Sequence, residues 1–109
     1  MGFRQSEVDY LISITAMELG ELTHDRANVT ADRIGRGVVT VVPVTSNIAH
    51  VFPVQVLLRA NATGLRVDSK AQAEQVRSVT VERIGPVLGL VPAKVMAEVD
   101  EALRLHLQL

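Results

Sequence analysis

One stretch of the chain, residues 38–47, constrains the possible fold more than any other. It reads Val-Val-Thr-Val-Val-Pro-Val-Thr-Ser-Asn, and apolar side chains fill both of its alternating faces. This pattern predicts a strand that is buried on both sides. Because a proline cannot donate to a sheet ladder, Pro43 predicts the end of that strand. Thr45, Ser46 and Asn47 follow without a charge among them. A rigid strand that ends in a polar cluster is a suitable place for a binding or reacting group.

Length and composition describe one globular domain over residues 1–109. The chain is 48% hydrophobic and 21% charged, which excludes a disordered or fibrous protein. The absence of cysteine excludes disulfides, thiolate catalysis and the common structural zinc sites. No apolar run approaches the ~20 residues of a membrane span, and no leader pattern opens the chain. The expected compartment is therefore the cytoplasm, with no membrane partner.

Charges are unevenly distributed along the chain. Residues 29–94 carry eight basic and four acidic side chains, although the whole chain has a net charge of −1. Two readings stay open, a solvated surface with uneven charges or a polyanion-binding site on the central strands. The chain has one tyrosine, two phenylalanines and no tryptophan, which argues against a base-stacking platform. The basic residues of the second reading are Arg33, Arg36, Arg59, Arg66, Lys70 and Arg77.

Two segments have the apolar spacing of helices. Residues 7–19 repeat apolar side chains at helical intervals after a capping-box pattern, which predicts an amphipathic helix. Near the other end, Pro92 suits a first helical turn, and Asp100 and Arg104 form an i,i+4 pair on the helix that follows. Its apolar stripe consists of Val95, Val99, Ala102 and Leu103, with Met96 and Leu107 at the border.

Alternating patterns predict two further strands. The first covers residues 52–58, where Pro53 confines the start to an edge or a bulge. The second begins at residue 65, and its apolar phase changes after residue 73, which predicts a bulge or break near residues 74–75. Loops or turns are expected at residues 23–28, 35–37 and 61–64.

No spacing matches a phosphate loop, a dinucleotide fingerprint or a nucleophile elbow. The three histidines form no recognisable metal cluster and the acidic residues are separated, so neither a metal nor a cofactor is expected. Hydroxyls and amides remain at predicted strand ends near cationic side chains. They suit the binding of a phosphodiester without a metal, or they form ordinary turns, and both interpretations stay open. These residues are Thr45, Ser46, Asn47, Gln75 and Arg77.

Several segments occur together in a recognisable order. They are Asp25-Arg26-Ala27-Asn28, residues 39–47, Phe52-Pro53, Gly64-Leu65, residues 68–78 and residues 99–103. This ordered set resembles the MazF/PemK family of toxin endoribonucleases, and its actinobacterial members in particular. The resemblance covers residues 25–109, whereas residues 1–24 are a divergent N-terminal segment.

The resemblance implies an α+β fold, a small SH3-like β-barrel with a C-terminal helix that works as a homodimer. It implies the toxin component of a type II toxin–antitoxin system, a metal-independent endoribonuclease that cleaves single-stranded RNA. The 2′-hydroxyl is the internal nucleophile, and a cyclic phosphate is left. Thr45 matches the family's catalytic threonine, and Ser46 and Gln75 match RNA-contacting positions beside Asn47 and Arg77. The cognate antitoxin is the second expected partner, and DNA is expected only as a target of the complex with antitoxin.

The N-terminal segment departs from the family pattern. The family opens with a strand, a flexible loop and an Arg-Pro pair that supplies a catalytic arginine. Counting back without gaps from Asp25, the arginine position falls on Met17 and the proline position on Glu18. A methionine offers neither charge nor donor, and the loss of one preorganised donor typically costs about 10²–10³ in rate. The barrel is therefore expected to be incomplete or altered at its N-terminus.

Three functional interpretations follow from this departure. The first is a toxin endoribonuclease, active or weakened. The second is a catalytically degenerate binding or decoy protein that retains the dimer and antitoxin surfaces. In the third, residues 1–24 come from a wrong start or a frameshift, and the chain is a broken copy.

Overall fold

The structure, a computed structural model, describes residues 10–14, 20–25 and 37–109. Within these ranges the chain forms strands, two short 3₁₀ turns and two helices. The strands are β1 (Tyr10–Ile14), β2 (Gly20–Asp25), β3 (Val38–Thr45), β4 (Gln55–Leu58), β5 (Ser69–Gln72), β6 (Arg77–Thr80) and β7 (Ile84–Val91). The helices are α1 (Ala60–Thr63) and α2 (Ala93–Leu107), and the 3₁₀ turns are η2 (Ala73–Gln75) and η3 (Val81–Arg83).

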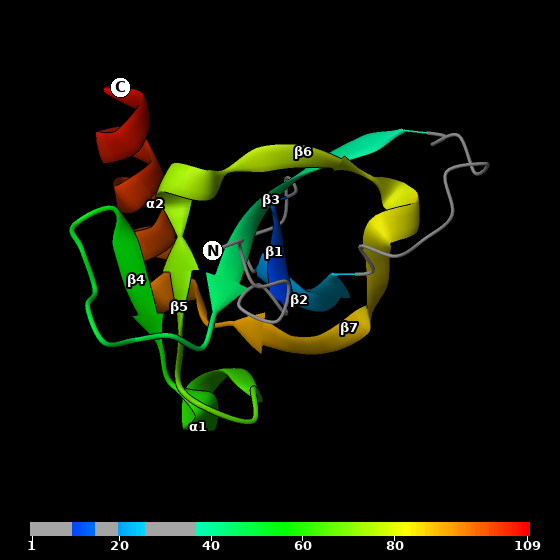
Figure 1. The fold of residues 1–109 in the computed structure, drawn as a ribbon, viewed down its shortest axis with the longest axis horizontal. Coiled ribbons are helices and arrows are strands. Elements are labelled where there is room, and N and C mark those ends of the chain that lie inside the picture. Colours follow the sequence, from blue (N-terminus) through cyan, green and yellow to red (C-terminus); the bar gives the residue numbers. More distant parts are fainter. Residues whose placement is uncertain (1–9, 15–19, 26–36) are drawn as a thin grey trace, which may run out of the picture.

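The strands form one antiparallel sheet in the order β4-β5-β3-β1-β2-β7, with β6 also paired to β3. In Figure 1, β6 and β7 curve around β1, β2 and β3, while α2 lies beside β4 and β5. The strand order has two ends, so the described sheet is barrel-like without being closed. The expected class, α+β with a barrel-like sheet and a C-terminal helix, is confirmed.

Strand β3 is buried on both sides at its second half, as its apolar run predicts. Residues 41–45 are all buried. Val42 and Val44 belong to the main core, whereas Val41 joins Leu11 and Val79 in a smaller cluster on the opposite face. Because side chains alternate along a strand, Thr45 lies on the face of Val41. The main core, which α2 covers, contains Ile12, Leu22, Val42, Val44, Val56, Leu58, Leu65, Ala71, Ala73, Val91, Met96, Val99 and Ala102.

Pro43 does not end β3, so that prediction is wrong. The strand continues to Thr45, and Pro43 lies opposite Leu11 of β1. On the other side, β3 pairs with β6 up to Val41 and with β5 from Val44 onward. The described ladder on that side is thus already interrupted at Pro43. A proline, which has no N–H to donate, is tolerated at such a gap.

The helix predicted over residues 7–19 is also wrong where the structure describes it. Residues 10–14 are strand β1, which pairs with both β2 and β3. Leu11 and Ile12 are adjacent and both fully buried, because the sheet is covered on both faces at this point. A short run of apolar residues on a doubly covered strand mimics helical spacing, so periodicity alone does not separate the two. Residues 7–9 and 15–19 lie outside the described part.

Two other boundaries differ from the predictions. Residues 23–25 end strand β2 rather than opening a loop, and residues 26–28 are outside the described part. The strand expected over residues 52–58 begins only at Gln55. A turn precedes it, in which the Gln55 N–H donates to the Phe52 carbonyl at 2.8 Å. This turn uses the backbone groups that a longer strand would have paired.

The later elements follow the sequence pattern more closely. The break expected near residues 74–75 is η2, and the strand before it is shorter than predicted, beginning at Ser69. The turn expected at residues 61–64 is α1, which ends at Gly64 with a φ of 86°. Of the turn expected at residues 35–37, only Gly37 is described.

Helix α2 confirms the predicted C-terminal helix after Pro92. Its ion pair differs from the expected one between Asp100 and Arg104. The Arg104 Nε lies 3.8 Å from the Glu101 Oε1 instead, at an i,i+3 spacing. The buried residues of α2 are Met96, Val99 and Ala102, with Val95 and Leu103 packed against the core.

Candidate functional site

The polar cluster at the end of β3 begins with a buried hydroxyl. Thr45 is only 4% exposed, whereas Ser46 and Asn47 are exposed. The Asn47 N–H donates to the Thr45 Oγ1 at 3.2 Å, which is the hydroxyl turn expected where a strand ends. The turn interpretation of this cluster is therefore confirmed for Thr45. The same turn fixes the hydroxyl at the end of β3, with exposed polar groups directly after it.

A buried cation lies opposite this threonine. Lys70 of β5 is the register partner of Thr45, so both side chains lie on the same face of the sheet. Lys70 is only 7% exposed. Its Nζ donates to the His50 carbonyl and lies 5.7 Å from the centroid of the Phe52 ring. A lysine buried to this extent needs such partners, because an unpaired buried ammonium is costly.

Sequence reasoning named Lys70 only as one of several basic residues and did not place it at the site. The alternation of residues 69–73 puts Lys70 on the polar face of its strand, and that is the one available signal. Which strand lies opposite depends on long-range register, which the pattern does not contain. The structure therefore adds Lys70 to the candidate site.

Two polar side chains follow on the same face of β5 and β4, and a third, Glu74, lies in η2 directly after β5. Gln55 and Gln72 are register partners on this face, and the Gln55 Nε2 donates to the Glu74 Oε2 at 2.8 Å. The Gln72 Oε1 and the Glu74 Oε1 are both buried, and neither accepts a hydrogen bond from the described residues. Leaving a buried acceptor unpaired costs about 1–3 kcal/mol. These oxygens are thus available to water or to a donor group.

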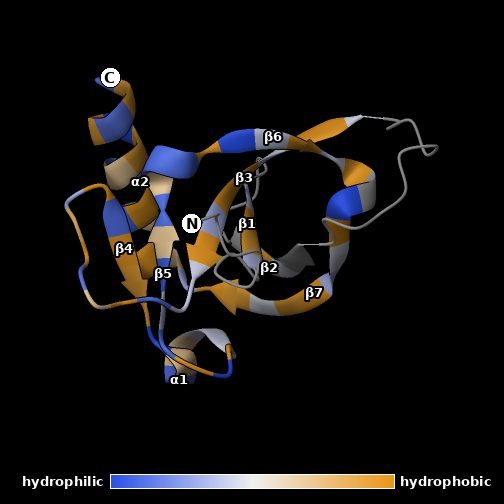
Figure 2. Ribbon diagram, in the orientation of Figure 1, coloured by the Kyte–Doolittle hydropathy of each residue, from blue (hydrophilic) through white to orange (hydrophobic). Residues whose placement is uncertain are grey.

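The two remaining predicted residues lie at the break in the sheet. Gln75 ends η2 and is exposed, and Arg77 begins β6 and is exposed. In Figure 2 the hydrophilic colour gathers at this turn and at the start of β6. Arg77 is the register partner of Val41, so it shares the face of Thr45, displaced by four residues or about 13 Å along β3. Thr45, Lys70 and Arg77 thus share one face, on which the buried Val41 of the smaller apolar cluster lies between Thr45 and Arg77.

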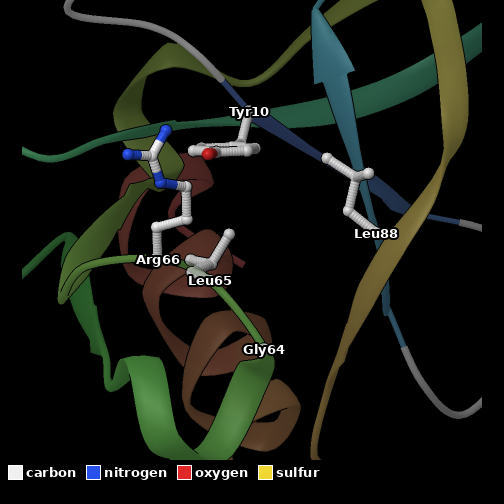
Figure 3. Close-up of a pocket in the computed structure, with 5 residues that line it drawn as sticks. All are labelled: Tyr10, Gly64, Leu65, Arg66 and Leu88. Carbon is white, nitrogen blue, oxygen red and sulfur yellow. The ribbon is translucent and has the colours of Figure 1, made fainter.

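A pocket of about 250 Å³ lies elsewhere in the molecule. Figure 3 shows Tyr10 and Arg66 side by side in it, with Leu88 across from them. Tyr10 is the register partner of Val44, so its side chain is on the face opposite to that of Thr45. Gly64 and Leu65 complete the lining, and the five predicted site residues take no part in it.

Metal ligands and basic side chains also bear on the chemistry of the site. Within residues 10–14, 20–25 and 37–109, no three His, Asp or Glu side chains gather as a metal site would require. Arg59 forms an ion pair with Asp68 at 3.5 Å. Met17, which occupies the counted arginine position, lies outside the described residues.

Comparison with known proteins identifies the family. A sequence model described as PemK-like, MazF-like toxin of type II toxin-antitoxin system matches residues 23–107. The chain belongs to the MazF/PemK toxin family. It is 62% identical over 88 residues to "Endoribonuclease MazF9" of Mycobacterium tuberculosis, across 81% of this chain and 75% of that protein. The suspected resemblance is confirmed.

Solved structures of MazF toxins share the fold. The structure titled "Mycobacterium tuberculosis toxin MazF-mt6" matches with a TM-score of 0.63 and 19% identity, over 93% of this chain and 97% of that one. An "Endoribonuclease in complex with its cognate antitoxin from Mycobacterial species" matches with a TM-score of 0.55 and 18% identity, over 94% of each chain. At these identities the matches establish the architecture.

Among the described residues, neither helix has the length and apolar character of a membrane span.

Proposed function

We propose that this MazF-like toxin is an endoribonuclease that cleaves single-stranded RNA without a metal ion. The observation that carries the proposal is the register of β3 and β5, which sets the buried Thr45 opposite the buried Lys70 on one face of the sheet. A hydroxyl donor beside a fixed positive charge suits a phosphodiester whose charge grows during reaction. The exposed residues around it, Ser46, Asn47, Gln75 and Arg77, would contact the rest of the RNA.

The proposed reaction uses the RNA's own nucleophile. The 2′-oxygen attacks the adjacent phosphorus and the P–O5′ bond breaks, which gives a 2′,3′-cyclic phosphate and a 5′-hydroxyl. One proton leaves the 2′-hydroxyl and one reaches the 5′-oxygen, so the reaction consumes no water. A threonine hydroxyl is far too weakly acidic to lose its proton near neutral pH, so Thr45 does not serve as the general base. Thr45 therefore donates to a non-bridging phosphate oxygen and orients it.

The proposed partners follow from the family. They are a cognate antitoxin and a second copy of the chain, in the cytoplasm. The solved relative in complex with its cognate antitoxin supports the first of these. A metal is not part of the proposal, because the 2′-hydroxyl attack requires only positioned donors, charge and proton transfer.

A second candidate function rests on one specific observation. The position at which the family's catalytic arginine is expected holds Met17. A chain without that cation would keep the family's binding surfaces and act as a catalytically inert partner of the antitoxin.

One assay separates the two functions. Purified protein is incubated with 5′-labelled single-stranded RNA in EDTA, beside the same sequence as DNA. We expect fragments ending in cyclic phosphate from the RNA and none from the DNA. Cleavage that requires added Mg²⁺ would contradict the proposed mechanism. Intact RNA together with tight binding of the antitoxin would establish the second function instead.

A further inference from the structure

Two aromatic rings lie together on the loop that follows the candidate site. The ring centroids of His50 and Phe52 are 6.0 Å apart, with 34° between their planes. Both residues are exposed, and Phe52 is 56% exposed although it is one of only two phenylalanines in the chain. Ile48 and Val51 of the same loop are also exposed, and exposed apolar surface that extends over several residues marks binding sites. The low aromatic content argued against a base-stacking platform, but the structure brings two of the few rings together.

Lys70 connects these rings to Thr45. Its ammonium lies over one face of Phe52 and also donates to the backbone carbonyl of His50. Lys70 is at the same time the register partner of Thr45. The lysine opposite Thr45 therefore contacts both ring-bearing residues, His50 through its backbone and Phe52 through its ring.

The backbone of Phe52 is held a second time. Its N–H donates to the Gln55 Oε1 at 3.1 Å, and its carbonyl accepts from the Gln55 N–H at 2.8 Å. Gln55 is itself anchored through its Nε2 to Glu74. The backbone that carries the ring is therefore fixed, which lowers the conformational freedom that the loop loses on binding.

We infer that His50 and Phe52 form a stacking platform for a nucleobase of single-stranded RNA next to the cleaved phosphate, with Lys70 as its positioning residue. The inference rests on the proposed function. Every base has a π-face, so an exposed ring accepts any base without reading its sequence. The ammonium lies over the Phe52 ring, and more than half of the residue's surface stays exposed and open to a base. An exposed ring with a cation beside it offers a base a stacking partner and a phosphate a positive charge, which together match a nucleotide.

The absence of tryptophan makes a direct test possible. Phe52→Trp introduces a single reporter, whose fluorescence is quenched when a base stacks on it. The probe is an RNA oligonucleotide with one deoxynucleotide at the cleavage position, so that it binds without being cut. We expect quenching with this probe. We expect much weaker quenching when the nucleotide flanking the cleavage position is abasic.

Affinity gives the second readout. Phe52→Ala should weaken binding of the intact probe about tenfold, equivalent to about 1.4 kcal/mol, and should weaken the abasic probe far less. Leu105→Ala is the matched control, because Leu105 is also 56% exposed and lies on α2, which packs on the other face of the sheet. It should leave the affinity unchanged.

The role of Lys70 is tested in the Phe52→Trp background. Lys70→Met should reduce the quenching, and Lys70→Arg should restore it, because an arginine can keep both the hydrogen bond and the cation–π contact. Full quenching with Lys70→Met would overturn the positioning role.

The outcomes separate the inference from the proposed function. Wild-type protein that fails to bind the probe would overturn both. Wild-type binding with an unchanged affinity for Phe52→Ala would overturn the platform alone. It would leave the proposed nuclease site at Thr45 standing.

Discussion

The hydroxyl of Thr45 is already engaged in its own turn, where it accepts the Asn47 N–H at 3.2 Å. Accepting that bond leaves the hydroxyl proton free to be donated elsewhere. The sequence left two interpretations open, an ordinary turn and a phosphodiester-binding group. Thr45 can close the turn and still donate its proton to a phosphate. The two interpretations were compatible, because one uses the oxygen as an acceptor and the other uses the proton.

A further prediction at the residue scale concerns Glu74. It accepts the Gln55 Nε2 at 2.8 Å, and through Gln55 it holds the turn at Phe52. We expect Glu74→Ala to lower the free energy of unfolding by about 1–3 kcal/mol, because it leaves a part-buried amide unpaired. Urea denaturation measures this. Glu98→Ala on the exposed side of α2 is the control, with an expected change within about 0.5 kcal/mol. Equal stability of both variants would show that the Gln55–Glu74 bond contributes nothing.

At the scale of elements, β7 and α1 pack so closely at Gly89 that no side chain fits between them. A Cβ built on Gly89 would lie 2.1 Å from the Thr63 carbonyl oxygen. That atom belongs to backbone, so the strand or α1 itself would have to shift. We expect Gly89→Ala to destabilise the fold by about 1–3 kcal/mol or more.

Gly37→Ala is the matched control for this element-scale prediction. A Cβ at Gly37 meets no atom within 4 Å. Thermal unfolding of the two variants should therefore differ, with a clear fall in Tm only for Gly89→Ala. A normal Tm for Gly89→Ala would mean that α1 does not pack on β7 as described.

The elements also show how far the sequence could predict this fold. The buried β3, the break at η2 and helix α2 follow from local patterns, and each was predicted. Strand β1 was mistaken for a helix because its apolar residues face two cores at once. Lys70 was missed as a site residue because its position depends on which strands pair, and no local pattern encodes pairing.

At the scale of the whole molecule, one face of the sheet carries the candidate site and the other carries α2. RNA binding should weaken with salt, since each phosphate contact to a single strand adds about −0.7 to the slope of log K against log salt. We expect Arg77→Gln to reduce the magnitude of that slope by about 0.7. Arg104→Gln, which removes an exposed arginine from α2, should leave the slope unchanged. Equal slopes for both variants would place the RNA away from β6.

The central claim is that the end of β3 is the nuclease site of a MazF-like toxin. One measurement tests it directly. The rate of RNA cleavage in EDTA is compared for wild type, Thr45→Val and Thr40→Val. Both variants remove a hydroxyl from the same strand at similar volume, but Thr40 is exposed and opposite Ser78 of β6. We predict that Thr45→Val lowers the rate by about 10²–10³ and that Thr40→Val stays within about twofold of wild type. Cleavage by Thr45→Val at the wild-type rate would contradict the account.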